Sequence, residues 1–395
     1  MMNNKLVPSI RFKEFTNAWE QRRVGDLFKI TNGNPLDLIF INPNQTHKYK
    51  YPVFTSKTVN NGLAGYYDKY LFSDSITWTT DGYAGNVMFR PGKFYCTGHS
   101  GVLESINYAN YANALAINKV AYKHVKTGAI PTLKIIDMKE IKFWLSPTNK
   151  ECTKISALII FLRKSISLLQ CKLEKLKNLK NNLLEKMFAD EKHPFPKIRF
   201  KEFTNDWEQR NFNDFYQFAA EGGTPSTHVA TYYKNGNIPF VKIQDLECKY
   251  IFKTQNYITN KALKNSSAWL LKANNLLISN GATIGKISIN KVDLTTKQGI
   301  LGIVLKEAYS PEFLYFLLST ESFQNKIKKI TVSSTIPTLL LKNLDKLRLN
   351  IPGSEKEQKR LTILLDRIEE YISLLQRKLE KMENIKNTLL QKMFV

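Results

Sequence analysis

Two long segments of this 395-residue chain carry an apolar heptad pattern. In residues 159–187 and 365–393, apolar side chains recur at alternating steps of three and four, with charged residues beside them. The pattern predicts two long helices, and a helix with one apolar stripe needs a partner in water. We therefore expect the two helices to pack together. The predicted seam consists of Ile159, Leu162, Ile166, Leu169, Leu173, Leu176, Leu183, Leu365, Ile368, Ile372, Leu375, Leu379, Met382 and Leu389.

One lysine interrupts each seam at the same place, Lys180 in the first copy and Lys386 in the second. A polar seam residue can fix the register of a helix pair at some cost in stability. A lysine can also extend its ammonium group into solvent and have no such role. The sequence leaves both interpretations open.

The rest of the chain is repeated as well. Residues 8–22 and 196–210 differ only at Ser9/Lys197 and Ala18/Asp206. The regions that follow, 23–150 and 211–353, have diverged, and they alternate short strand-like runs with turns rich in Gly, Asn and Asp. A helix is expected from Ser310, because a serine cap is followed by Pro311.

These patterns predict an α+β fold, with two mixed α/β domains in a pseudo-two-fold arrangement. An antiparallel pair of long coiled-coil helices would separate the two domains, whereas a parallel pair would crowd them at one end. The expected divisions are a first domain with its opening segment, a first long helix, a second domain with its opening segment and a second long helix, at 1–150, 151–192, 193–353 and 354–395.

Charge adds a class of partner. Lys and Arg number 58 against 34 Asp and Glu, which gives a formal net charge of +24. Such an excess suits a polyanion, most often nucleic acid, although the lysine-rich composition of an AT-rich genome would also raise it. The N-terminus lacks the apolar core of a signal peptide, and the run 155–162 is too short to cross a bilayer, so no membrane association is expected. Four scattered cysteines favour a reducing cytoplasm.

No catalytic or metal-binding motif is complete. The segment Gly281–Lys286 is one residue short of a phosphate-binding loop, and Ile287 stands where Ser or Thr would hold magnesium. The five histidines have no metal-ligand spacing. We therefore predict neither a catalytic residue nor a metal site in this chain.

The layout resembles the specificity subunit of type I restriction-modification systems along nearly its whole length. The resemblance is carried by the paired opening segments with Trp19 and Trp207, and by the helix ends Lys186–Phe188 and Lys392–Phe394. Three further stretches are similar to the family's target-recognition domains: Glu221–Ser226 (degraded to Thr31–Pro35 in the first half), Ile238–Val241, and Ser279–Gly285 (answered by Asp81–Gly85).

The resemblance implies a subunit that is not an enzyme. Two target-recognition domains would each read one half of an asymmetric bipartite site in double-stranded DNA. The helices would set the gap and dock two modification subunits, which methylate adenine with S-adenosylmethionine. Restriction subunits that use ATP and Mg would join them in the bacterial cytoplasm, so no cofactor is expected in this chain. The alternatives are a stand-alone DNA nuclease or methyltransferase, and a coiled-coil scaffold for acidic partners.

Candidate DNA contacts are polar side chains on turns beside predicted strands, where Lys can reach phosphates and Asn, Gln or Thr can reach bases. Each of them could equally be an ordinary solvated loop residue. In the first domain they are Lys57, Thr58, Asn60, Asn61, Thr80, Asp81, Tyr83, His99 and Ser100. In the second domain they are Lys242, Gln244, Asn280, Thr283, Lys297 and Gln298.

Overall fold

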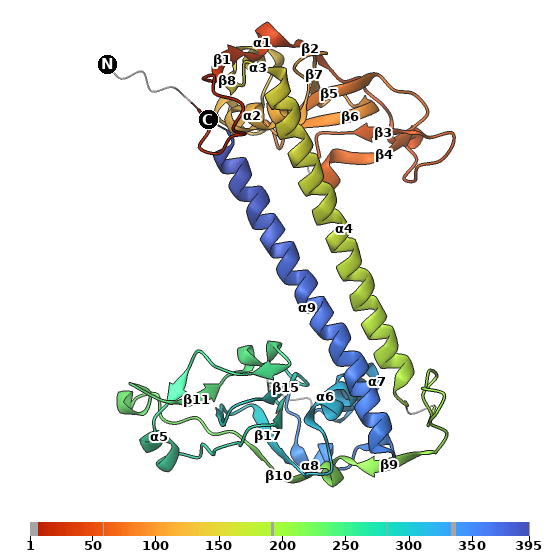
Figure 1. Cartoon of the computed structure of the whole chain (residues 1–395), viewed down its shortest axis with the longest axis vertical. Coiled ribbons are helices and arrows are strands. Elements are labelled where there is room, and N and C mark those ends of the chain that lie inside the picture. The colour runs from red at the N-terminus through yellow and green to blue at the C-terminus, as the bar shows by residue number, and fades with distance from the viewer. Residues whose placement is uncertain (1–6, 58, 191–192, 282, 333–336, 395) are drawn as a thin grey trace. The chain divides into compact units, whose positions relative to one another are not determined.

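The computed structural model describes residues 7–57, 59–190, 193–281, 283–332 and 337–394. It divides the chain into two compact units, Met1–Gln170 with Arg377–Val395, and Cys171–Gln376. Each unit therefore contains the beginning of one long helix and the end of the other (Figure 1). In the described part of the chain, every helix is too short or too polar to cross a membrane.

The first unit is built on a six-stranded sheet in the order β2-β7-β5-β6-β3-β4, beside a separate two-stranded pair, β1-β8. Its strands are β1 (Glu20–Arg23), β2 (Lys29–Asn32), β3 (Tyr51–Phe54), β4 (Leu63–Tyr67), β5 (Phe72–Thr79), β6 (Val87–Cys96), β7 (Ser100–Glu104) and β8 (Lys142–Leu145). Its shorter helices are α1 (Val24–Leu27), α2 (Tyr111–Ala121) and α3 (Ile135–Glu140). Helix α2 lies against β6, with Ile76, Trp78 and Ile117 fully buried in the core.

The second unit repeats this plan with its strands divided between a five-stranded sheet, β10-β17-β14-β15-β12, and a three-stranded sheet, β13-β11-β16. A two-stranded pair, β18-β9, corresponds to β1-β8. The strands are β9 (Trp207–Asn211), β10 (Tyr216–Glu221), β11 (Ile238–Val241), β12 (Tyr250–Ile251), β13 (Tyr257–Ile258), β14 (Asn275–Ser279), β15 (Ile287–Asn290), β16 (Thr295–Thr296), β17 (Ile300–Leu305) and β18 (Arg348–Pro352). The shorter helices are α5 (Asn260–Lys264), α6 (Pro311–Ser319), α7 (Glu321–Ile330) and α8 (Leu341–Leu344). The expected start of α6 is confirmed, since the Ser310 hydroxyl accepts a hydrogen bond from Phe313 N.

The two long helices are α4 (Asn149–Met187) and α9 (Glu355–Lys392). In the first unit, Ile155 and Ile159 near the start of α4 share a core with Met393 and Phe394 just past the end of α9. In the second unit, Leu184 near the end of α4 shares a core with residues from the start of α9, Leu361 and Leu365. The start of one helix meets the end of the other in both units, so the predicted antiparallel pairing is confirmed within each (Figure 1).

The predicted seam residues all lie buried or half-buried. Lys180 is half-buried, and its Nζ lies 2.7 Å from Glu369 Oε1 across the helix pair. Lys386 is also half-buried, and it lines a small apolar cavity with Ile159 and Leu162. Lys180 thus has a specific partner on the opposite helix, which favours its interpretation as a register-fixing residue.

A buried glutamate anchors the opening segment of each unit to the first turn of a long helix. In the first unit, Arg11 donates from Nε and Nη2 to both Glu151 carboxylate oxygens (2.6 and 2.8 Å), and Trp19 Nε1 donates to Oε2 (3.3 Å). The glutamate lies in the N-terminal turn of α4, where the helix dipole favours a negative charge.

The second unit repeats this arrangement. Arg199 donates to Glu357 at 2.7 and 2.8 Å, and Trp207 Nε1 donates to the same carboxylate at 3.4 Å. The hydrogen bond to Glu357 raises the pKa of the Arg199 guanidinium. Each tryptophan also packs edge-on against the phenylalanine that follows a long helix, Trp19 on Phe394 and Trp207 on Phe188.

Candidate nucleic-acid interface

Three of the predicted loops of the first unit meet at residues 97–99, the connector between β6 and β7. Thr97 N donates to Phe54 O at the end of β3 (2.9 Å), and Thr80 N donates to His99 O (3.3 Å). The loop after β3 (residues 55–62) and the loop after β5 (residues 80–86) therefore border the same connector. The sequence did not reveal that these loops meet, because their meeting depends on the parallel pairing of β3 with β6, which lie far apart in the chain.

Asp81 and His99 face each other across this junction, with His99 Nδ1 2.8 Å from Asp81 Oδ2. A groove of about 350 Å³ lies beside them. Its lining residues are Asn32, Thr80, Asp81, Gly98, Thr132, Lys134, Ile135 and Ile136. Sequence reasoning missed Asn32, Thr132 and Lys134 as candidates. A signal for Thr132 was present, because the repeated segment Ile130–Leu133 contains it.

The second unit brings its predicted residues together in the same way. Lys297 N donates to Val241 O at the end of β11 (2.9 Å), and Asn280 N donates to Gly299 O (3.0 Å). Residues 297–299 therefore connect the loop after β11 with the loop after β14. Lys242 Nζ donates to Asn256 Oδ1 (2.9 Å), which ties its ammonium group to the residue before β13.

The loops after β5 and β14 have the same turn geometry. Thr79 Oγ1 donates to Tyr83 O (2.5 Å) and accepts from Asn86 N (3.0 Å). In the second unit, the Ser279 hydroxyl likewise donates to Thr283 O and accepts from Lys286 N (2.9 Å). Both turns require a glycine in the left-handed region, Gly85 at φ +86° and Gly285 at φ +89°. Tyr83 and Thr283 thus occupy equivalent tips.

The segment Gly222–Pro225 and its degraded copy, Thr31–Pro35, make equivalent close backbone contacts. A Cβ on Gly222 would lie 2.2 Å from Thr296 O, and a Cβ on Gly33 would lie 2.3 Å from Thr97 O. Only glycine fits either position, because both backbones run against the connector. The prolines that follow each accept a hydrogen bond from a tyrosine, Tyr95 to Pro35 O and Tyr233 to Pro225 O.

Most of the candidate DNA-contacting side chains are accessible. Tyr83 lies at a loop tip with 72% of its surface exposed. Those that are exposed or half-buried are Lys57, Asn60, Asn61, Thr80, Asp81, Tyr83, His99, Lys242, Gln244, Thr283, Lys297 and Gln298. Thr58 lies outside the described residues.

Two candidates are not accessible. Ser100 is 2% exposed, because it is the first residue of β7 and pairs with Thr79 on the inner face of the sheet. Asn280 is 4% exposed, because its backbone is held on both sides, by Gly299 O and by Leu339 N. The prediction that the side chains of Ser100 and Asn280 are free to contact bases is therefore corrected. Both residues instead join neighbouring segments through backbone hydrogen bonds, from Gly33 N to Ser100 O and from Asn280 N to Gly299 O.

The chemistry of these loops suits a nucleic acid. Lysine ammonium groups can neutralise phosphates, amide and hydroxyl groups can both donate to and accept from base edges, and an exposed tyrosine can stack on a base. Asp81 is the only acidic member of the candidate set, and it can accept a hydrogen bond from a cytosine amino group.

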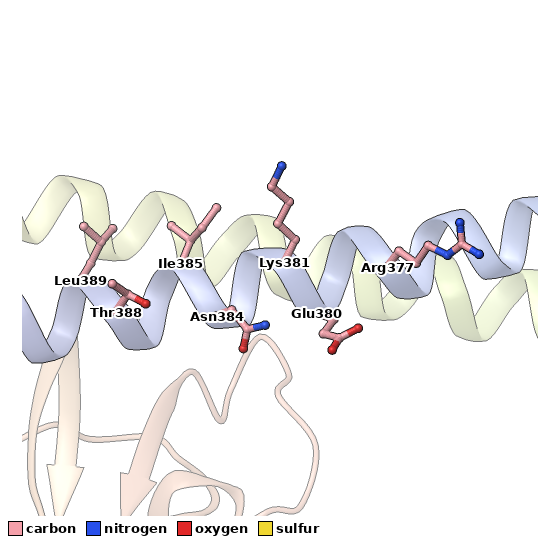
Figure 2. A pocket seen from close by; sticks show the side chains of 7 residues that line it. All are labelled: Arg377, Glu380, Lys381, Asn384, Ile385, Thr388 and Leu389. Carbon is pink, nitrogen blue, oxygen red and sulfur yellow. The ribbon is translucent and has the colours of Figure 1, made fainter. Parts of the chain in front are cut away.

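A second surface lies on α9 in the first unit (Figure 2). There a shallow groove of about 410 Å³ runs along a single helix, and its side chains repeat at intervals of three and four residues. The groove is lined by Arg377, Glu380, Lys381, Asn384, Ile385, Thr388 and Leu389. A groove along one helix, with charged and apolar side chains together, is suited to another helix.

The sequence model of a protein family, the type I restriction modification DNA specificity domain, matches residues 17–178 and 204–384 of this chain. The chain is 34% identical over 162 residues to the type I restriction enzyme MjaIX specificity subunit of Methanocaldococcus jannaschii, a match that covers 40% of this chain and 37% of the relative. A putative type I specificity subunit of Mycoplasma pneumoniae is 34% identical over 130 residues, 32% of this chain and 35% of the relative. The chain thus matches little more than a third of the length of these relatives.

Other similarities extend over the whole chain at lower identity. The MjaVIII specificity subunit of Methanocaldococcus jannaschii is 22% identical over 94% of this chain and 91% of its own length. The crystal structure of the S subunit of a type I restriction-modification system from M. genitalium superposes with a TM-score of 0.67 at 16% identity. It covers 98% of this chain and 99% of that one. The duplicated fold is therefore shared along the whole length.

Proposed function

We propose that this chain, which belongs to the family of type I restriction-modification DNA specificity domains, reads an asymmetric bipartite DNA site for a modification and restriction complex. One observation carries the proposal. Two units of equivalent backbone present different side chains at equivalent positions, Tyr83 against Thr283 and His99 against Gly299. Equal scaffolds with unequal loops suit the recognition of two different half-sites.

In this proposal, lysines on the loops bind phosphates and set the register on the duplex. Lys57 serves the first unit, and Lys242 and Lys297 serve the second. The polar groups beside them read bases in the major groove, where each base pair presents a distinct pattern of donors and acceptors. Because the equivalent loop tip carries Tyr83 in the first unit and Thr283 in the second, the two half-sites would be read by different kinds of contact.

The helix pair would serve two further purposes. It would set the number of unread base pairs between the half-sites, and it would dock the modification subunits. Apolar side chains on the outer faces of the helices support the docking role. They are Phe161, Leu168 and Ile385 in the first unit, and Leu179, Ile363, Tyr371 and Leu374 in the second.

The proposed role is not catalytic. S-adenosylmethionine, ATP and Mg would be bound by the modification and restriction subunits, and this chain would supply DNA sequence recognition to them. The competing proposal, a stand-alone nuclease or methyltransferase, requires DNA cleavage or methyl transfer by the purified chain alone.

The decisive experiment maps methylated adenines in DNA from cells that carry this chain together with its modification subunit. The expected result is one bipartite motif with a fixed unread gap, which disappears when this chain is deleted. Methylation that persists without the chain would refute the proposal. Cleavage or methylation of DNA by the purified chain alone would favour the competing enzyme.

A further inference from the structure

A cavity of about 240 Å³ in the first unit is strongly cationic. It lies at the junction of β6, α2 and α4, and among the described residues two arginines and no carboxylate line it. Its lining consists of Phe54, Asn61, Asn86, Val87, Met88, Phe89, Arg90, Pro91, Tyr111, Ala114, Leu115, Asn118 and Arg163. A cavity with this lining attracts an anion.

Arg90 supplies the buried charge. Only 9% of its surface is exposed, its Nε donates to Thr77 Oγ1 (3.0 Å), and its guanidinium lies 3.8 Å from the centre of the Phe54 ring. Within the described part of the chain, no carboxylate forms an ion pair with it. Burial lowers the pKa of Arg90 to about 10. A cation held away from water without a countercharge is costly, and an anion in the cavity would remove that cost.

Arg163 adds a second charge from α4. Its guanidinium lies 5.4 Å from the centre of the Tyr111 ring, and its charge lowers the pKa of Arg90 further. Two arginines that repel one another across a cavity favour an anion between them. Their planar guanidinium groups match the oxygens of a phosphate.

The second unit shows how the same junction looks when its charge is neutralised internally. The aligned helix repeats place Asp366 and Glu369 of α9 where α4 has Ile160 and Arg163. There Lys249, nearly buried between α6 and α9, pairs with Asp366 and lies 3.5 Å from Glu369. In the second unit two carboxylates therefore face two cations, Lys249 and Lys180, whereas no carboxylate of the described residues lines the cavity of the first unit.

We propose that the cavity around Arg90 and Arg163 binds one phosphodiester group of the DNA beside the first half-site. The proposal rests on the proposed DNA-reading function. Its location follows from Asn61, which lines the cavity and belongs to the loop of residues 55–62 in the candidate interface. A strand read by this loop passes the mouth of the cavity, where a phosphate can accept hydrogen bonds from both arginines.

The first test compares Arg163→Gln with Lys164→Gln in the full chain, by fluorescence anisotropy with a random-sequence duplex over a range of salt concentrations. Both variants remove one exposed cationic side chain from α4, but Lys164 does not line the cavity. For Arg163→Gln we expect about ten-fold weaker binding. The slope of log affinity against log salt should also fall by about 0.9, the value for one lost phosphate contact. The control should change neither.

The second test uses Arg163→Glu, which introduces the carboxylate that the second unit has at this position. The new carboxylate would neutralise Arg90 from within, so the melting temperature of the free chain should rise while DNA affinity falls. A fall in both would indicate ordinary damage to the fold and overturn the proposal. Arg163 is exposed on its helix, so this variant avoids the folding risk of replacing the buried Arg90.

Inorganic phosphate distinguishes the two sources of the anion. If phosphate stabilises the wild-type chain but not Arg163→Gln, and the two bind DNA with equal salt slopes, the cavity holds a free anion and the assignment to DNA is wrong. If the wild-type chain binds DNA and Arg163→Gln behaves like Lys164→Gln, the cavity proposal fails and the reading function stands. If the wild-type chain binds no DNA, the proposed function itself fails.

Discussion

At the scale of single residues, Glu151 and Glu357 are buried carboxylates that need hydrogen-bond partners. Each is buried in the first turn of a long helix, and each accepts hydrogen bonds from an arginine and a tryptophan of the opening segment. The sequence analysis singled out Trp19 and Trp207 but did not identify the acceptor of their hydrogen bonds. Neither glutamate differs from its many charged neighbours until the fold brings Arg11 or Arg199 beside it.

Replacing Glu357 with alanine should destabilise the second unit by about 3–5 kcal/mol, because it leaves Arg199 unpaired in a largely buried site. Chemical denaturation of the full chain measures this change. Glu355→Ala, two residues earlier, removes only an exposed pair with Lys359 and should change the free energy of unfolding by about 0.5 kcal/mol or less. Equal effects of the two substitutions would contradict the anchoring role.

Tyr83 and Thr283 form a second pair of residues that can be compared, since they occupy equivalent loop tips. Tyr83→Ala should leave stability nearly unchanged, because the ring is exposed. It should weaken recognition of the first half-site by about ten-fold, the effect of losing one stacked base. Methylation mapping with each variant provides the measurement.

Thr283→Ala is the matched control for Tyr83→Ala and should affect only the second half-site. If either substitution altered both half-sites, the two units would not read DNA independently.

At the scale of helices and strands, the heptad seams were predictable because their signal is local and repeated. The sheets were not, since their strands pair over long sequence distances. Strand β6 continues through Pro91 and Gly92 with a register shift opposite Asp74, which has a positive φ of 44°. The equivalent stretch of the second unit is divided into β15 and β16, in two different sheets. No local pattern distinguishes these outcomes.

Two leucines of α9 lie on different faces of the helix pair, one on the inner face and one on the outer face. Leu365 is fully buried, whereas Leu374 is 58% exposed. Leu365→Ala should cost about 2–5 kcal/mol in the free energy of unfolding, measured by denaturation. Leu374→Ala should leave the free chain unchanged and weaken its association with the modification subunit, measured by co-purification. Loss of stability in Leu374→Ala would place that side chain in the core and contradict a docking face.

At the scale of the whole molecule, duplication makes a modular function testable. Exchange of residues 211–353 for the matching region of a relative should change one half of the methylated motif and leave the other half intact. The physical reason is that both loops and connector of the second interface lie within this range. A change in both halves would show that the units do not act separately.

The proposed spacing role of the helices has its own test. One additional heptad at matching places in α4 and α9 should lengthen the unread gap and preserve both half-sites, because a heptad keeps the seam in phase. Methylation mapping reports the gap directly. An unchanged gap would exclude the helix pair as the determinant of spacing.

The candidate interface was predictable in outline, because polar turns beside strands mark loops with a binding role. Two kinds of information were missing from the sequence. Burial of Ser100 and Asn280 depends on strand pairing and on backbone hydrogen bonds to distant residues. The cationic cavity combines side chains from β6, α2 and α4, which are distant in sequence. The strand-like run that contains Arg90 has an ordinary composition, so nothing in it indicated a buried cation.

The way in which the helix ends are shared has a consequence for biosynthesis. Ile10 N donates to Lys392 O, and Trp19 packs on Phe394, so the core of the first unit closes only when residues 392–394 meet residues 10–19. The second unit is one continuous stretch of chain, residues 171–376, whereas the first unit joins two separate stretches. A chain that stalls before residue 389 would therefore leave the first core open and expose apolar surface of the kind that chaperones bind.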